Sequence, residues 1–360
     1  MNYAAKLICV AFVLAPVFPG HAQDTAIAGI KAKADAGDPD SQNAMGLACE
    51  NGQGMAADPA AAADWFQKSA TQGNPNAERN LALMYLAGKG IKQDFTEAAK
   101  WLGKAAGQNF AAAQSTLGSL LVDGKVVPQD TADGVKWLQK AADQNYAEAE
   151  DNLGMMTLQG SGVPQSNDDA LKLFQKAADQ NYASAQEHLA GLYIDGTGVS
   201  QNDATAFGLA QQAAFQGYAA AESTVGWMYS AGRGTSQDAA EAVKWLQKAA
   251  DQNFAEAENT LGQMYEAGKG MKQDYAAAVD WYRKAAQQGY GGAENNLAVA
   301  IAQAHGAGPD PVEALKWFEL AAAHGDKNGQ DVRDALTKGM TPAQIAQAEK
   351  EVQEFRPVGY

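Results

Sequence analysis

Polar and apolar positions recur along this chain with a period of 36 residues. Trp65, Trp101 and Trp137 are evenly spaced, and the same step reaches Leu173, Leu209, Trp245, Trp281 and Trp317. A column of small residues keeps the same spacing: Gly46, Ala82, Gly118, Gly154, Ala190, Gly226, Gly262 and Ala298. This regularity, without an insertion or deletion, indicates a tandem repeat that fills most of the chain.

One helix of each repeat, called helix B, carries the tryptophan column. Around Trp101, the apolar residues 98, 101, 102, 105 and 106 follow a helical spacing and predict one buried stripe. Glu97, Glu241 and Glu313 lie at the spacing of a capping box. A column of N-terminal capping residues begins helix B: Asp58, Asp94, Asp130, Ser166, Asn202, Asp238, Asp274 and Asp310. A column of Gly and Asn ends it: Gly73, Asn109, Asn145, Asn181, Gly217, Asn253, Gly289 and Gly325.

The other helix, helix A, starts just beyond this column and has its own apolar stripe. Its first buried position is alanine in seven repeats: Ala77, Ala113, Ala149, Ala185, Ala221, Ala257 and Ala293. A Gly-x-Gly loop, such as Gly88-Lys89-Gly90, then turns the chain toward helix B. Neither helix can bury its stripe alone, so neighbouring hairpins must stack into an α-solenoid with a concave and a convex surface.

The repeat unit resembles a known family. The run from Ala257 to Tyr265 (AENTLGQMY), followed by the Gly-x-Gly loop, the capping Asp and the Trp, resembles the Sel-one-like repeat (SLR) of the tetratricopeptide-repeat superfamily. The resemblance covers roughly residues 26–336 and implies an all-α, right-handed α–α superhelical solenoid of helical hairpins. It also implies adaptor work between proteins, because bacterial members include exported regulators and envelope scaffolds.

Residues 1–22 have the layout of a secretory signal peptide. Lys6 precedes an apolar run from Leu7 to Phe18, and Gly20-His21-Ala22 places small residues at a cleavage point before Gln23. The run is shorter than the roughly 20 residues that a membrane span needs. We therefore expect a periplasmic or secreted protein. A buried N-terminal helix is the alternative interpretation.

Three regions follow from these patterns: the signal peptide at 1–22, a solenoid at 23–340, and a C-terminal helix and tail at 341–360. The solenoid contains about eight units and an N-terminal half unit, a lone helix B at residues 26–36. Thr341-Pro342 begins the last helix, which runs to about Phe355. We expect this helix to cap the solenoid. The alternative is that it docks onto a partner.

Composition restricts the function. The net charge is −15, with 27 basic and 42 acidic residues, which argues against binding to nucleic acid. With one mature cysteine and three scattered histidines, we expect no metal site and no cofactor. No phosphate loop, nucleophile elbow or serine β-lactamase motif is present, so we expect no enzyme activity. The alternative is a cell-wall or β-lactam-related hydrolase or binder of the cysteine-rich SLR type, although the paired cysteines of that type are missing here.

Two columns have a structural and a functional interpretation. Cys49 occupies the position of Tyr85, where a small buried side chain is more plausible than a reactive thiol. The first turn of helix A carries Glu78, Gln114, Glu150, Gln186, Glu222, Glu258 and Glu294. Acidic residues are favoured there by the helix dipole, and a ligand-binding row of acids is the alternative.

We expect the partner surface at aligned positions that share one face of helix A and change their residue type freely from repeat to repeat. We expect a protein or peptide partner, with envelope components as one source, to bind the concave face. The residues that would line this face are Asn80, Leu83, Ser119, Asn152, Met155, His188, Trp227 and Gln263. The alternative is that these side chains pack between adjacent A helices.

Overall fold

The computed structural model describes residues 20–306, 308–326 and 328–358, and every regular element among them is an α-helix. The chain divides after Gln180 into two compact units. The first unit contains α2 (Gly20–Asp35), α3 (Pro39–Asn51), α4 (Pro59–Thr71), α5 (Pro75–Ala87), α6 (Phe95–Gly107), α7 (Ala111–Asp123), α8 (Thr131–Ala142), α9 (Ala147–Gln159) and α10 (Asn167–Asp179).

The second unit continues the same alternation of helices. It contains α11 (Ala183–Asp195), α12 (Asp203–Phe215), α13 (Ala219–Ala231), α14 (Ala239–Asp251), α15 (Ala255–Ala267), α16 (Tyr275–Gln287), α17 (Gly291–Ala302), α18 (Pro311–Ala323), α19 (Gln330–Thr337) and α20 (Pro342–Glu354). Odd-numbered helices from α3 to α17 are the predicted A helices, and even-numbered helices from α4 to α18 are the predicted B helices.

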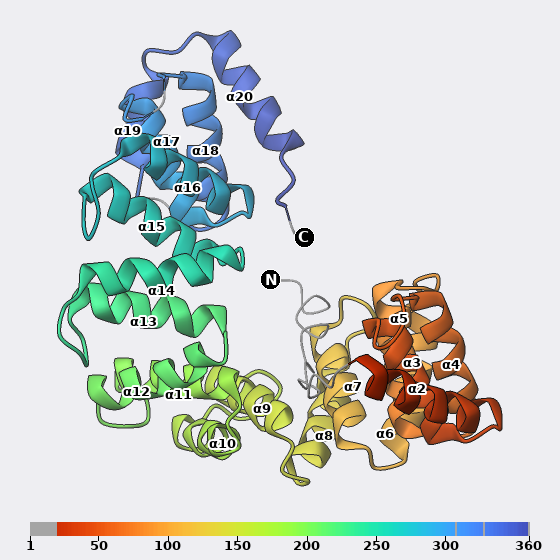
Figure 1. Ribbon diagram of the computed structural model, residues 1–360. Coiled ribbons are helices and arrows are strands. Elements are labelled where there is room, and N and C mark those ends of the chain that lie inside the picture. The colour runs from red at the N-terminus through yellow and green to blue at the C-terminus, as the bar shows by residue number, and fades with distance from the viewer. Residues whose placement is uncertain (1–19, 307, 327, 359–360) are drawn as a thin grey trace. The chain divides into compact units, whose positions relative to one another are not determined.

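Each hairpin packs on the next within its unit. Helix A contacts the following helix B, as α13 contacts α14, and helix B contacts the next helix A, as α12 contacts α13 (Figure 1). Successive A helices also contact each other directly, as α5 does with α7 and α15 with α17. The A helices therefore form the inner layer of each unit, and the B helices form the outer layer.

The column of small residues lets each hairpin close. A Cβ atom built on Gly262 would lie 2.5 Å from the ring of Tyr282, and one built on Gly154 would lie 2.7 Å from the ring of Phe174. Tyr282 and Phe174 each lie 20 residues after their glycine, on the helix B of the same hairpin, and both are buried. The large side chain of helix B thus fills the space that the small residue of helix A leaves.

Helix B begins and ends as predicted, with one correction. In all eight B helices from α4 to α18 the capping side chain accepts a hydrogen bond from a backbone N–H of the first turn, as Asp94 does from Glu97. None of Glu97, Glu241 and Glu313 completes the predicted capping box, because their carboxylates pair instead with Lys100, Lys244 and Arg283. Asn109 and its equivalents adopt the left-handed conformation expected of the C-terminal column.

The chain ends differ partly from the prediction. The signal peptide lies mostly outside the described residues, and α2 begins at Gly20 rather than near residue 26. At the other end, α19 was not predicted and occupies the helix A position of an incomplete ninth repeat. The last helix does begin at Pro342, with a complete capping box between Thr341 and Gln344. It packs on α18, where the rings of Trp317 and Phe355 lie 5.4 Å apart.

The closeness of helix A to helix B generates a stability prediction. Gly262→Ala should destabilise the protein by about 1–3 kcal/mol, because the added methyl group overlaps the ring of Tyr282. The matched control is Gly103→Ala in α6, where a Cβ would meet nothing within 4 Å. That substitution should stabilise the protein by about 0.5–1 kcal/mol through helix propensity alone. Denaturant midpoints followed by circular dichroism measure both effects.

Adding Tyr282→Leu to Gly262→Ala should recover part of the lost stability, since it recreates the natural pair Ala82 and Leu102. Equal stabilisation by the two glycine substitutions would show that the small column does not control the packing.

Candidate functional site

The candidate residues of the first unit lie on three successive A helices. Asn80 and Leu83 are on α5, Ser119 is on α7, and Asn152 and Met155 are on α9. The amide of Asn152 donates a hydrogen bond of 3.0 Å to Ser119 Oγ, and Asn80 donates one of 3.1 Å to Asn43 Oδ1 on α3. Leu83 and Met155 are half-buried. The two asparagines therefore tie neighbouring A helices together, as the packing alternative expects.

The candidate residues of the second unit are more accessible. His188 on α11 is half-buried, whereas Gln263 on α15 is exposed and Trp227 on α13 keeps 38% of its surface exposed. In the same unit, Thr224 donates a hydrogen bond of 2.5 Å to Glu187 on α11. The column of Asn80 thus links A helices in both units, while the column of Leu83 reaches solvent at Trp227 and Gln263. Whether these residues bind a partner stays a prediction.

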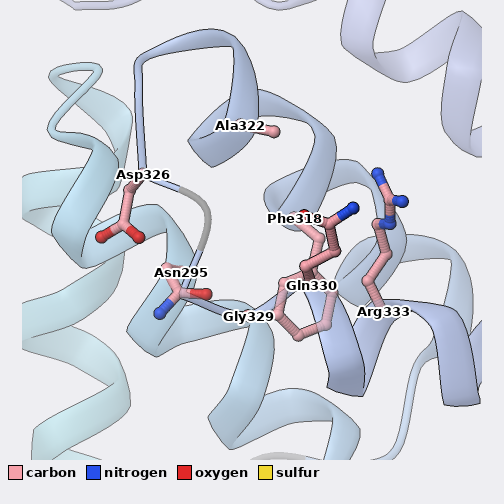
Figure 2. Close-up of a pocket in the computed structure, with 7 residues that line it drawn as sticks. All are labelled: Asn295, Phe318, Ala322, Asp326, Gly329, Gln330 and Arg333. Carbon is pink, nitrogen blue, oxygen red and sulfur yellow. The ribbon is translucent and has the colours of Figure 1, made fainter.

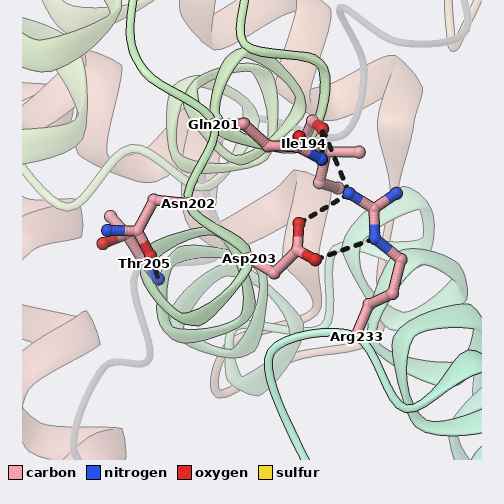
Figure 3. A network of polar contacts seen from close by, with 6 residues as sticks. All are labelled: Ile194, Gln201, Asn202, Asp203, Thr205 and Arg233. Atoms are coloured by element: carbon pink, nitrogen blue, oxygen red, sulfur yellow. Dashed lines mark hydrogen bonds and ion pairs between the residues drawn. The ribbon is translucent and has the colours of Figure 1, made fainter.

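Trp227 is held in place from the loop that follows its helix. The guanidinium carbon of Arg233 lies 5.2 Å from the centre of the Trp227 ring, within the range of a cation–π contact. Figure 3 shows the two hydrogen bonds that Arg233 makes to the carboxylate of Asp203, at 2.6 and 3.0 Å. Arg233 also donates to the carbonyl oxygen of Ile194 at 3.2 Å. The bidentate pair fixes the guanidinium, which in turn supports the ring.

The Glu and Gln column of helix A is occupied by internal hydrogen bonds. The residue at the end of each helix B donates to the column residue 30 positions earlier, as Gln180 does to Glu150 at 2.6 Å. The other pairs are Gln72–Gln42, Gln108–Glu78, Gln144–Gln114, Gln216–Gln186, Gln252–Glu222, Gln288–Glu258 and His324–Glu294. We call these eight pairs the hairpin ladder. Its carboxylates are buried, so they do not form an accessible row of acids.

Burial determines the titration of the ladder. It raises the pKa of Glu150, while Lys176 and the hydrogen bond from Gln180 act in the opposite direction. Burial likewise raises the pKa of Glu78, Glu222 and Glu258, while a nearby lysine and the glutamine that bonds to each carboxylate lower it. Each ladder carboxylate therefore costs the folded protein some stability when it is charged.

A second polar cluster lies on the inner layer of the first unit. Tyr146 donates a hydrogen bond of 3.2 Å to the buried carboxylate of Glu148. Burial raises the pKa of Glu148, Arg79 lowers it, and burial raises the pKa of Tyr146 to about 12. The Ser115 hydroxyl lies near Glu148 without the geometry of a hydrogen bond, and the buried Nε of Arg79 has no hydrogen-bond partner. The positive charge of Arg79 therefore partly compensates the carboxylate of Glu148.

Two carboxylates of the second unit, Glu187 and Glu256, have no lysine or arginine among the groups that shift their pKa. Glu187 uses one oxygen to accept the hydrogen bond from Thr224, and its other oxygen is buried without a partner. Burial and the nearby charge of Glu256 raise the pKa of Glu187. Glu256 on α15 is exposed, yet the surrounding protein displaces enough water to raise its pKa as well. Both lie on the helices that carry His188 and Gln263.

A cavity of about 160 Å³ lies at the end of the second unit, where α17, α18 and α19 meet. Figure 2 shows Asn295, Asp326 and Arg333 around it. The Oδ1 atom of Asn295 is buried without a hydrogen-bond partner. Arg333, however, is engaged by Asp334 at 2.9 Å, so the cavity offers no free cation.

Other chemistry has little support among the described residues. Cys49 is buried, with its thiol 3.5 Å from the sulfur of Met55, which confirms the small-apolar interpretation of this position. No group of three or more His, Cys, Asp or Glu side chains is arranged to hold a metal ion in the part of the chain described here. None of the described helices has the length and apolarity that crossing a membrane requires.

Comparison with known proteins identifies the fold family. A model of the Sel1 repeat matches eight segments, at residues 39–74, 75–110, 111–146, 147–182, 183–218, 219–254, 255–290 and 292–326. The chain therefore belongs to the Sel1 repeat family. The predicted all-α solenoid of 36-residue hairpins is confirmed.

Two solved structures illustrate the likeness. A Sel1 repeat protein from Oxalobacter formigenes is 30% identical, with 91% of this chain and 99% of that chain covered and a TM-score of 0.57. The chain is also similar to c5321, a protective antigen of uropathogenic Escherichia coli strains that displays an SLR fold. That protein is 27% identical, with 92% of this chain and 87% of that chain covered and a TM-score of 0.46. No curated protein matches the chain.

Sequence reasoning missed the partners of the predicted columns. The glutamines that end the B helices recur every 36 residues beside the Gly and Asn column, but their partners lie 30 residues away on another helix. Glu187 and Glu256 stand in columns that also contain Asn, Ser and Ala, so neither column drew attention. Other repeats also carry charges in these columns, namely Arg79 and Asp151 in that of Glu187 and Glu148 in that of Glu256.

The hairpin ladder generates a prediction about pH. Because the pKa of Glu150 is raised in the folded protein, the unfolded chain releases this proton at a lower pH than the folded protein does. The folding stability linked to the proton is complete below the ordinary pKa of a glutamate and is lost as the pH rises through the raised pKa. Glu150→Gln, which copies Gln114 and Gln186, should therefore leave stability unchanged near pH 4 and increase it toward pH 7. Thermal unfolding of both proteins across this range measures the difference.

Glu150→Ala should instead cost about 1–2 kcal/mol at both pH values, because the Gln180 amide loses its acceptor. Glu241→Gln, on the exposed surface of α14, should show no gain that grows with pH. A Glu150→Gln protein that becomes steadily less stable than wild type as the pH rises would contradict the burial argument.

Proposed function

We propose that this Sel1 repeat protein is an exported scaffold that binds a protein partner through the inner layer of its A helices. The observation that carries the proposal is the exposure of large apolar side chains in one column. Among the described residues, five large hydrophobic side chains are exposed, and two of them, Leu47 and Trp227, belong to the column of Leu83. Exposed aromatic side chains on such a face are typical of protein contacts.

The helices themselves support this choice of face. Several polar side chains form hydrogen bonds between neighbouring A helices, which limits the movement of the inner layer without a ligand. Rigid presentation lowers the entropy that binding must overcome. Export rests on the signal-peptide pattern of residues 1–22, which is an argument from sequence alone.

No observation favours a hydrolase of the cysteine-rich type. That class depends on paired cysteines in each repeat, whereas Cys49 is the single cysteine within the described residues and is buried. Incubation with a chromogenic β-lactam is the direct test, and turnover would overturn our choice.

The partner surface can be mapped by photo-crosslinking in cells. A photoreactive amino acid at position 263, on the inner layer, should give a discrete crosslinked adduct. The same residue at position 244, on the outer surface of α14, should not give that adduct. Equal capture from both positions, or capture from position 244 alone, would place the contact elsewhere. Both side chains are exposed, so neither replacement disturbs the core.

Export has a separate test. The mature protein should begin at Gln23 and appear in the periplasmic or secreted fraction, as N-terminal sequencing measures. Deleting residues 2–22 should retain the whole protein in the cytoplasm. Release of the deleted form to the same extent as wild type would show that residues 1–22 are not the signal.

A further inference from the structure

The outer face of α12 differs from the outer face of the other B helices. At the position of Gly208 the other seven repeats all carry a charge: Asp64, Lys100, Lys136, Lys172, Lys244, Asp280 and Lys316. At the position of Gln212 six of them carry lysine: Lys68, Lys104, Lys140, Lys176, Lys248 and Lys284. At the position of Thr205 five carry a carboxylate: Glu97, Asp133, Asp169, Glu241 and Glu313. Helix α12 therefore lacks the charges that the repeat normally places on its outer face.

Phenylalanine occupies a fourth position on the same face. The equivalents of Phe215 are small or polar: Thr71, Gly107, Asp143, Asp179, Asp251, Gln287 and Ala323. The Phe215 side chain keeps 71% of its surface exposed. Its ring makes an edge contact with Trp245 on α14, with the ring centres 5.5 Å apart. Packing within the chain thus leaves most of this aromatic ring in water.

The four residues form one stripe, which we call the neutral stripe. Thr205, Gly208, Gln212 and Phe215 follow the spacing i, i+3, i+7 and i+10, so they lie within about 80° of the helix circumference. The buried residues of α12 lie on the opposite side: Ala206, Ala210, Ala213 and Ala214. Thr205 and Gln212 are exposed, and a Cβ built on Gly208 would meet nothing within 4 Å. The described part of the chain therefore leaves the neutral stripe uncovered.

The charges around the neutral stripe lie at its edges. Asp203, the only charged residue of α12, is paired with Arg233 at one end of the helix (Figure 3). The neighbouring helix α14 carries Glu241, Lys244 and Lys248. An uncharged patch that contains an exposed aromatic ring and has a charged rim has the composition of a protein contact surface.

The neutral stripe is suited to contact with a second copy of this chain. Two copies with a net charge of −15 repel each other, and the repulsion is smallest where the facing surfaces carry no charge. In an antiparallel pair of α12 helices, related by a two-fold axis at the level of Ala210, Phe215 lies opposite Thr205 and Gln212 lies opposite Gly208. A large side chain then faces a small one in each pair. A two-fold interface requires such a self-complementary surface.

We propose that the neutral stripe joins two copies of this protein into a two-fold dimer through antiparallel contact of their α12 helices. The proposal goes beyond the proposed function, because the contact lies on the outer layer and leaves the A helices of both copies open. Each dimer presents two inner layers, so a partner with two binding sites is held more tightly by the dimer than by one copy.

Sedimentation velocity of the protein purified from cells tests the proposal at concentrations from about 1 to 500 µM. A contact between two single helices is small, so the dimer should form only as the concentration rises through this range. Added salt should maintain or strengthen the dimer, because it screens the repulsion between the two acidic copies. A protein that stays monomeric at every concentration would overturn the proposal.

Phe215→Asp should weaken the dimer at least about tenfold, because the new carboxylate would be buried opposite Thr205 without a partner. Gly208→Lys should weaken it to a similar extent for the same reason. Both changes copy residues that other repeats carry at these positions, so the fold should tolerate them. The control, Thr71→Asp, adds the same charge at the equivalent position of α4 and should change association less than about twofold. Equal losses from Phe215→Asp and Thr71→Asp would show that net charge alone controls association, and the proposal would be wrong.

A stability measurement separates dimer contact from a role in folding. At about 1 µM, where the protein should be monomeric, Phe215→Asp should shift the thermal midpoint by less than about 2 °C, since its ring is mostly exposed. A large fall in the midpoint of both Phe215→Asp and Gly208→Lys would assign the neutral stripe to folding of the monomer instead.

A mixture of two variants tests the antiparallel arrangement. Phe215→Asp and Thr205→Lys should each associate weakly alone, whereas a mixture of the two proteins should form heterodimers, because the introduced charges face each other across the interface. A mixture that associates no more strongly than its components would overturn the arrangement, and so would a dimer that neither variant weakens.

Discussion

The close approach of helix A to helix B, made possible by a small residue on helix A, determines the geometry of each hairpin. Helix A and helix B approach until the side chain at the position of Phe174 fills the space beside Gly154. A Cβ at Gly154 would overlap the ring of Phe174, so these two helices would have to move apart locally. Glycine faces a large ring in Gly154–Phe174 and Gly262–Tyr282, whereas alanine faces Ala210 in one hairpin and Phe318 in another, so the column requires a small residue but not always glycine.

The hairpin ladder adds a hydrogen bond between the two helices to this apolar contact. Each helix B ends with unsatisfied carbonyl groups and a chain reversal, and its final Gln reaches back to the helix A of the same hairpin. The acceptor is a glutamine in some repeats and a buried glutamate in others, so a carboxylate is not required for the bond. The last pair uses His324 in place of glutamine, at the end of the eight matched repeats.

Periodicity predicted the fold well because it records packing directly. The tryptophan, alanine and glycine columns mark contacts that the hairpins repeat. Comparing the repeats of this one chain reveals these contacts, so no homologous sequence is needed. The column of Asn80 was harder to interpret, since Asn80, Asn152 and Thr224 are polar and vary in type. Their partners lie on a neighbouring A helix, 33 to 37 residues away, and no local spacing distinguishes a bond between helices from a bond to a ligand.

Function in a repeat protein is therefore best sought where a column departs from its own rule. The column of Leu83 varies between leucine, serine, methionine, glycine, tryptophan and glutamine, whereas the neighbouring column of Gly154 holds only glycine and alanine. Trp227, in the variable column, keeps 38% of its surface exposed, although packing within a chain normally buries most of an aromatic ring. Contacts within the chain therefore do not explain a large apolar side chain at this position, whereas a partner that covers the ring would explain it.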